Sequence, residues 1–147
     1  MGSKSPFPRV RTLTLEEQIF HMEARWPEFR VVKRRRQLEV VWRGSIQPAP
    51  LSSVYSVSLR FRPGWCPVVR VLSPELVPRE GADSLPHIYP DGCLCLNENH
   101  EWHDGLTVAE TTVPWASAWL YFYEVWHGTG LWQGGGTHPE RPEHRSE

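Results

Sequence analysis

Two of the chain's three cysteines stand in one short stretch, His87-Ile-Tyr-Pro-Asp-Gly-Cys-Leu-Cys-Leu-Asn97. The residues Pro90, Asp91 and Gly92 favour a tight turn, so the stretch predicts a loop that presents the thiol of Cys95. A thiolate is a good nucleophile and a good leaving group, so one sulfur can accept an acyl group and surrender it to nitrogen. The sequence therefore predicts Cys95 as a catalytic nucleophile. Side chains that could position, polarise or relay protons around it are His87, Asn97, Asn99, His100 and His103.

The elements that must position this loop begin with a helix. The sequence Thr14-Leu-Glu-Glu17 matches a capping box, in which the side chains of Thr14 and Glu17 each satisfy a free amide. Leu15, Ile19, Met22 and Trp26 then recur at helical spacing, and Pro27 follows. We therefore predict an amphipathic helix that ends near Trp26.

Three strands are predicted next, because the period of the apolar residues changes to two. Alternation runs through residues 38–43 and 55–62, and a third short strand is predicted at Val68 to Leu72. The basic run Lys33-Arg-Arg-Arg36 is interpreted as a solvated edge between helix and strand, with a docking patch for an acidic protein as the alternative. A helix followed by an antiparallel meander indicates an α+β fold.

The remainder of the chain predicts a long loop and a second helix. Residues 73–92 contain four prolines and no convincing element, which is typical of functional loops. Pro114 favours a helix start, and Trp115, Trp119, Phe122 and Trp126 form an aromatic stripe that we expect to face the core before the helix ends by Gly128. The glycine-rich residues 128–136 lack the Lys-Ser/Thr pair of a phosphate-binding loop.

Length and composition favour one globular domain, expected over residues 11–136, with flexible tails at 1–10 and 137–147. A formal net charge of −1 argues against global attraction to nucleic acid or membranes. The odd cysteine count favours a reducing compartment over a secreted disulfide framework. No stretch suits a signal peptide or a membrane span, so we expect a cytoplasmic protein. Neither a cofactor nor a metal is expected.

The order of these features resembles the ubiquitin-conjugating enzymes, and specifically the short conjugating proteins of type II CBASS, the antiphage loci for cyclic-oligonucleotide signalling. The local match is Gly92-Cys-Leu-Cys-Leu96, which is similar to the family's Gly-x-Ile/Leu-Cys-Leu active-site string, with Trp102 at about the family's distance. The stretches Arg62–Pro74 and Val113–His138 extend the resemblance over roughly residues 14 to 138. The resemblance implies a ubiquitin-conjugating-enzyme-like fold whose C-terminus is truncated before the last two helices of the eukaryotic enzymes.

The resemblance also implies a thioester carrier. Cys95 would accept the C-terminal glycine of a donor and pass it to an amine, and in the CBASS relatives the donor is the tail of a cGAS/DncV-like nucleotidyltransferase. The alternative donor is a bacterial ubiquitin-like protein. No adenylating domain is present, so activation would come from a separate activating enzyme or be bypassed. The sequence departs from the family's His-Pro-Asn motif, because Ile88 and Tyr89 follow His87; the oxyanion donor therefore stays unassigned among loop amides, Asn97, Asn99 and His100.

Three other classes of function stay open from the residues alone. The first is a zinc module built from Cys93, Cys95, His100 and His103, although this spacing does not match that of the usual fingers. The second is a Cys–His hydrolase, which would release a free product. The third is a noncatalytic scaffold that binds the nucleotidyltransferase. For His87 the alternative to a catalytic role is ordering of the loop through backbone hydrogen bonds.

Overall fold

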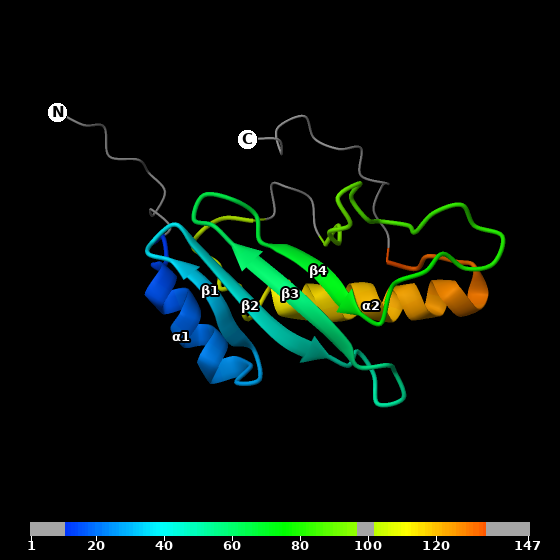
Figure 1. Cartoon of the computed structure of the whole chain (residues 1–147), viewed down its shortest axis with the longest axis horizontal. Coiled ribbons are helices and arrows are strands. Elements are labelled where there is room, and N and C mark those ends of the chain that lie inside the picture. Colours follow the sequence, from blue (N-terminus) through cyan, green and yellow to red (C-terminus); the bar gives the residue numbers. More distant parts are fainter. Residues whose placement is uncertain (1–10, 97–101, 135–147) are drawn as a thin grey trace, which may run out of the picture.

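Residues 11–96 and 102–134 are described by the computed structural model of the chain, and within them a helix precedes four strands and a second helix follows (Figure 1). The strands form one antiparallel sheet in the order β1-β2-β3-β4. This arrangement is the α+β meander that the sequence predicts. The bounds are α1 Leu15–Arg25, β1 Arg30–Arg35, β2 Glu39–Ile46, β3 Tyr55–Phe61, β4 Val68–Ser73 and α2 Thr112–Thr129.

The predicted capping box starts α1. The amide of Glu17 donates to the hydroxyl of Thr14 at 3.1 Å, and the amide of Thr14 donates back to the Glu17 carboxylate at 3.2 Å. A polar side chain that the helical period does not single out, Gln18, is completely buried. Its amide nitrogen donates to the Leu106 carbonyl at 2.8 Å, and its oxygen accepts from the Val108 amide at 2.9 Å. Gln18 thus joins α1 to the segment before α2.

The sheet confirms three predicted strands and corrects their number to four. The alternation puts Val40, Trp42 and Ile46 of β2 in the core, opposite the buried side chains of β3. The strand that the sequence reading missed is β1, which contains most of the basic run. Its six residues are all exposed and its pairing with β2 has an irregularity after Val31, so no apolar alternation marks it.

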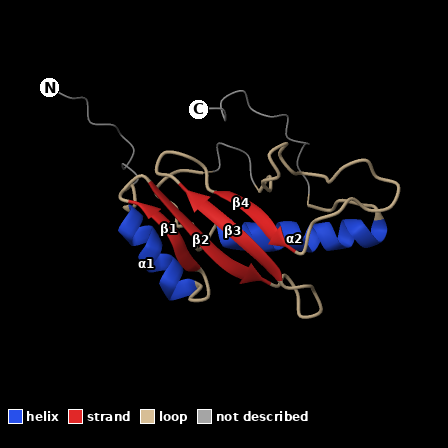
Figure 2. Cartoon of the chain, viewed as in Figure 1, coloured by secondary structure: helices blue, strands red, loops and turns tan. Residues whose placement is uncertain are grey.

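The second helix supplies much of the core behind the sheet. In Figure 2 α2 crosses behind β3 and β4 and extends past them, and neither helix crosses the front of the sheet. Trp119 and Trp126 are buried as predicted, but Trp115 and Phe122 are only half-buried, which corrects the predicted stripe. The buried face is Thr112, Val113, Ala116, Trp119, Leu120, Tyr123 and Trp126. The helix ends at Thr129, one residue beyond the predicted limit of Gly128, and Gly130 then adopts the left-handed conformation at φ 80°.

The long loop between β4 and the cysteine stretch lies along the far part of α2. The Tyr123 hydroxyl accepts from the Val77 amide at 3.1 Å, so a side chain of the helix holds the loop's backbone. Arg79 donates to the His127 carbonyl at 3.4 Å. No helix among the described residues combines the length and apolar character needed to span a membrane.

Candidate active site

The cysteine stretch folds into a small hairpin. The amide of Gly92 donates to the Tyr89 carbonyl at 2.8 Å and closes a turn, in which Gly92 has φ 87°, a conformation that suits glycine. Beyond the turn, Ile88 and Leu94 form an antiparallel bridge. The amide of Cys95 then donates to the carbonyl of His87 at 3.0 Å. The turn predicted from Pro90, Asp91 and Gly92 is confirmed.

The hairpin is attached to the edge of the sheet. The amide of Leu94 donates to the Val69 carbonyl at 2.9 Å, which ties the cysteine arm of the hairpin to β4. Arg70, the next residue of β4, donates to the Asp91 carbonyl at 2.6 Å. The Asp91 carboxylate in turn accepts from the Cys93 amide at 2.9 Å. These bonds fix the hairpin at both its turn and its arm, so the backbone at Cys95 is held by the sheet.

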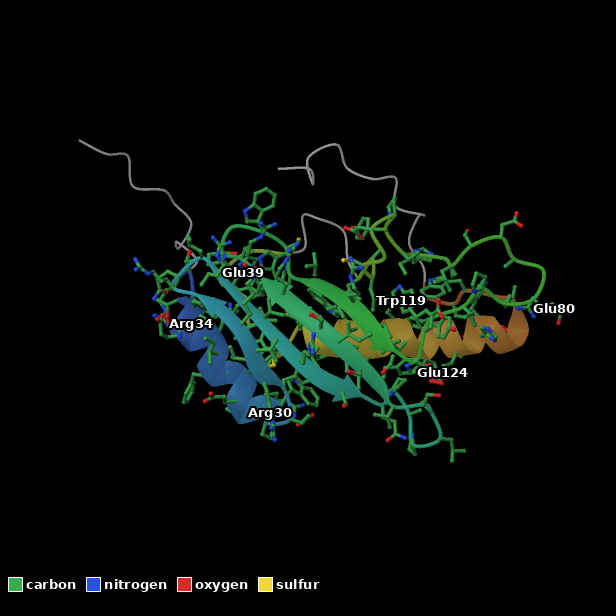
Figure 3. All side chains as sticks on the ribbon, in the orientation of Figure 1. Arg30, Arg34, Glu39, Glu80, Trp119 and Glu124 are labelled. Atoms are coloured by element: carbon green, nitrogen blue, oxygen red, sulfur yellow. The ribbon has the colours of Figure 1, made fainter. Side chains whose placement is uncertain are left out.

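The carbonyl of His87 links the hairpin to α2. It accepts from the indole nitrogen of Trp119 at 2.8 Å as well as from the Cys95 amide. The backbone of His87 has φ 48°, an uncommon conformation for a side chain with a Cβ. The His87 ring is buried and stacks on Trp132, with ring centroids 4.7 Å apart and 23° between the planes. Figure 3 labels Trp119 on α2, near the long connection between β4 and α2.

Cys93 and Cys95 have different environments although one residue separates them. Cys93 is buried with 7% of its surface exposed, whereas Cys95 is half-buried. Burial, and then the charge of Asp91, raise the pKa of the Cys93 thiol, and Arg70 opposes that shift. A buried thiol with a raised pKa is a poor nucleophile at neutral pH. Cys95 is therefore the more accessible thiol of the hairpin.

Beyond the hairpin, Trp102 begins a second connected segment. Its indole nitrogen donates to Asp104 at 3.0 Å, and the other carboxylate oxygen of Asp104 accepts from the Gly64 amide at 2.7 Å. The ring of Trp102 packs edge-on against Phe61 of β3. His103 is exposed between these residues, and its Nδ1 accepts from the Gly105 amide at 3.2 Å. Trp102 and Asp104 thus anchor the chain as it leaves the site.

Of the site residues predicted from the sequence, the structure brings Cys95 and His87 together through a backbone hydrogen bond. His103 lies in the Trp102 segment, and its role in proton transfer stays a prediction. Asn97, Asn99 and His100 lie outside the described residues. No group of three or more metal-ligand side chains occurs within residues 11–96 and 102–134.

Three side chains near the hairpin were not assigned to the site from the sequence: Arg70, Trp119 and Trp132. Trp119 belongs to the predicted aromatic stripe, but helical spacing does not indicate which acceptor its indole nitrogen donates to. Arg70 lies at an exposed strand position, where a cation is ordinary. Trp132 follows α2 in a glycine-rich segment, and no pattern in that segment indicates a partner for its ring.

Comparison with known proteins assigns the fold to a family. The family model described as "Type II CBASS E2 protein" matches residues 18–139. This range includes most of α1, the whole sheet, the hairpin and all of α2. No curated protein matches the chain significantly. Because the match covers most of the 147 residues, the chain belongs to the family of type II CBASS E2 proteins.

Proposed function

We propose that this protein is a conjugating enzyme that carries an acyl group as a thioester on Cys95 and transfers it to an amine. The observation that carries the proposal is the hairpin. The Leu94 amide attaches it to Val69 of β4, and the bond from the Cys95 amide to the His87 carbonyl holds the backbone of the half-buried Cys95. A nucleophile needs a fixed backbone and an accessible sulfur. Membership of the type II CBASS E2 family supports the same chemistry.

The donor we propose is the C-terminal glycine of a cGAS/DncV-like nucleotidyltransferase. A separate activating enzyme would first convert its carboxylate to an acyl adenylate or a thioester. The Cys95 thiolate then attacks the activated carbonyl, a C–S bond forms, and AMP or the activating enzyme's thiolate leaves. In the second step an amine attacks the thioester, a C–N bond forms, and the Cys95 thiol is released after the amine loses a proton. Conjugation of this kind would regulate antiphage cyclic-oligonucleotide signalling.

In this mechanism His87 is a positioning residue. Its carbonyl holds the Cys95 amide, and its ring is buried against Trp132 rather than free to exchange protons with solvent. Cys93 supports the hairpin from the inside, because its amide is held by Asp91 and its thiol is buried. The two cysteines therefore have different roles: the half-buried Cys95 is the nucleophile, and the buried Cys93 is a packing residue.

The test is co-expression of the protein with the nucleotidyltransferase from its locus and any activating enzyme encoded there. Intact mass and nonreducing gels should show a donor adduct that thiol reductant removes. Cys95→Lys should give an adduct that survives reductant, because an amide replaces the thioester. Cys93→Ser is the matched control and should still form the labile adduct. Absence of any adduct with wild type and Cys95→Lys would refute the carrier function.

The same experiment, together with a phage-protection assay and zinc analysis of the purified protein, separates the alternatives. An adduct whose mass matches a ubiquitin-like protein would show that the donor is that protein and not the nucleotidyltransferase, with the same thioester chemistry. Release of a free product without a persistent adduct would indicate a thiol hydrolase. Full phage protection by a Cys95→Ala strain would indicate a scaffold, and stoichiometric zinc that is lost with Cys95→Ser would indicate a metal module.

A further inference from the structure

The front of the sheet carries a row of side chains that crosses all four strands in register. Arg30 of β1 is paired with Arg43 of β2, Arg43 with Ser58 of β3, and Ser58 with Arg70 of β4. Paired residues of adjacent strands point to the same face, and strands lie about 4.8 Å apart, so this row is about 14 Å long. We call Arg30, Arg43, Ser58 and Arg70 the arginine row.

The row is part of a strongly basic face. All three arginines of the row are exposed, and they lie on the face away from the buried β2 and β3 side chains. Neighbouring outward positions hold three more cations. Lys33 and Arg60 are both paired with Val41, and Arg35 is paired with Glu39. The single carboxylate at the outward positions of the described strands is Glu39, which Figure 3 labels. Its oxygens lie 3.8 to 4.0 Å from these three cations. The face is therefore far more positive than the chain as a whole, whose formal charge is −1.

Arg30 and Arg43 have no such compensation. Neither forms an ion pair of 4.0 Å or less with a carboxylate in the described part of the chain. Like charges directly opposite each other on antiparallel strands destabilise the pairing. The fold thus keeps two unneutralised cations side by side on a face that no helix covers (Figure 2).

The row ends at the hairpin of the candidate active site. Arg70 donates to the Asp91 carbonyl and approaches the Cys93 sulfur to 3.9 Å. The backbone of Leu94, the residue before Cys95, is bonded to Val69 of the same strand. A partner that lies along the row would therefore reach the hairpin that bears Cys95.

We propose that the arginine row is a docking surface for an acidic segment of the donor protein, and that it holds the donor while its C-terminus is loaded on Cys95. This inference rests on the proposed function and names the chemistry of the partner's contact: closely spaced carboxylates on a polypeptide. Complementary charges raise the association rate and select the partner. Arginine suits this contact because its planar fork can bind carboxylates bidentately.

The face fits an acidic polypeptide better than nucleic acid. Sheets that bind single strands stack bases on aromatic side chains, whereas the outward positions of β2 and β3 hold valine, serine, arginine and glutamate. The occupant is therefore assigned to a protein.

The test measures noncovalent binding of the full-length nucleotidyltransferase from the same locus to the full-length Cys95→Ser protein, so that no thioester contributes. Arg30→Glu/Arg43→Glu reverses two charges of the row and keeps a like-charged cross-strand pair. The matched control is Arg25→Glu/Arg36→Glu, which makes the same change of net charge at exposed residues outside the row that, like Arg30 and Arg43, form no ion pair with a carboxylate in the described part of the chain. We expect the Kd to rise at least tenfold for the row variant and less than twofold for the control. The salt dependence of binding should also become flatter in the row variant.

Circular dichroism checks the fold of each variant, and Arg43→Ser serves as a milder row variant if the double reversal unfolds. Unchanged binding by folded row variants would overturn the inference, even where wild type forms the Cys95 adduct. Loss of binding in the row variants would support it, even where no adduct forms and the carrier function fails. Two further results would overturn it: row-dependent binding of a 20-base-pair DNA duplex with tighter Kd than the protein, or a row-dependent dimer of this chain by sedimentation.

Discussion

One oxygen atom, the carbonyl of His87, accepts both the Cys95 amide at 3.0 Å and the Trp119 indole at 2.8 Å. The first bond closes the hairpin and the second attaches it to α2. The position of the proposed nucleophile therefore depends on a helix that lies behind the sheet. Packing of α2 and placement of Cys95 are two aspects of one hydrogen-bonded junction.

Replacement of Trp119 by phenylalanine should weaken this junction. The ring volume is largely kept, but the buried carbonyl loses one donor, which costs about 1 to 3 kcal/mol together with the smaller ring. We expect the free energy of unfolding to fall by that amount in urea titrations, and loading of Cys95 to slow severalfold. Trp65→Phe, at a 40% exposed position, is the control and should change stability by less than about 0.5 kcal/mol. Equal effects of the two variants would contradict the junction.

The two hairpin cysteines should differ in reactivity and in its pH dependence. Because burial raises the pKa of the Cys93 thiol, its thiolate fraction at neutral pH is below that of an ordinary cysteine. Iodoacetamide at pH 7.5 should modify Cys95 at least tenfold faster, as followed by peptide mass spectrometry. Modification of Cys93 should accelerate as pH rises above the usual thiol range.

The raised pKa of Cys93 also makes the stability of the protein depend on pH. The folded state holds the Cys93 proton to higher pH than the unfolded state, so the unfolded state binds fewer protons in that window. The free energy of unfolding should therefore decrease as pH rises through the ordinary thiol pKa and level off above the raised one. Cys93→Ala should reduce this slope, and an unchanged slope would show that other groups cause it.

Gln18→Leu should destabilise the protein although it replaces a polar core residue by an apolar one of similar size. The Leu106 carbonyl and the Val108 amide would both lose their partner in a buried site. Two unsatisfied groups cost about 2 to 5 kcal/mol together. Thermal unfolding should show a much lower Tm than for Gln37→Leu, whose side chain is exposed at the β1–β2 turn. A Tm equal to that of the control would contradict the bridging role.

His103→Ala tests whether this imidazole acts as a base. Its Nδ1 accepts the Gly105 amide, so the neutral ring carries its proton on Nε2 and has no free acceptor. We therefore expect aminolysis of a preformed Cys95 adduct to slow less than about threefold, well below the hundredfold or more typical of a lost general base. His127→Ala, another exposed histidine, is the control. A hundredfold decrease for His103→Ala alone would establish it as the base.

Prediction from the sequence succeeds where burial imposes a period. The capping box, the alternation of β2 and β3 and the turn at Gly92 all follow from local rules, and the structure contains each of them. The strand β1 escapes these rules because all six of its residues are exposed at the edge of the sheet. Only its pairing with β2 makes it a strand, and that pairing is a nonlocal property.

The candidate site likewise combines residues that local sequence patterns predict with residues that depend on nonlocal contacts. Cys95 and His87 are identifiable from residue type and from the turn between them. Trp119 and Arg70 are distant in sequence and reach the hairpin through hydrogen bonds to carbonyl oxygens, which every residue possesses. The type of the acceptor residue therefore does not allow these contacts to be predicted. Three-dimensional packing decides which carbonyl each donor meets.

The positive φ of His87 and the stack of its ring on Trp132 lead to a prediction about related sequences. Glycine or asparagine would adopt φ 48° with less strain, so a histidine at this position has a conformational cost. Its stack on Trp132 offsets that cost. In alignments of this family, positions 87 and 132 should therefore vary together, with small or amide residues at 87 where the aromatic at 132 is lost.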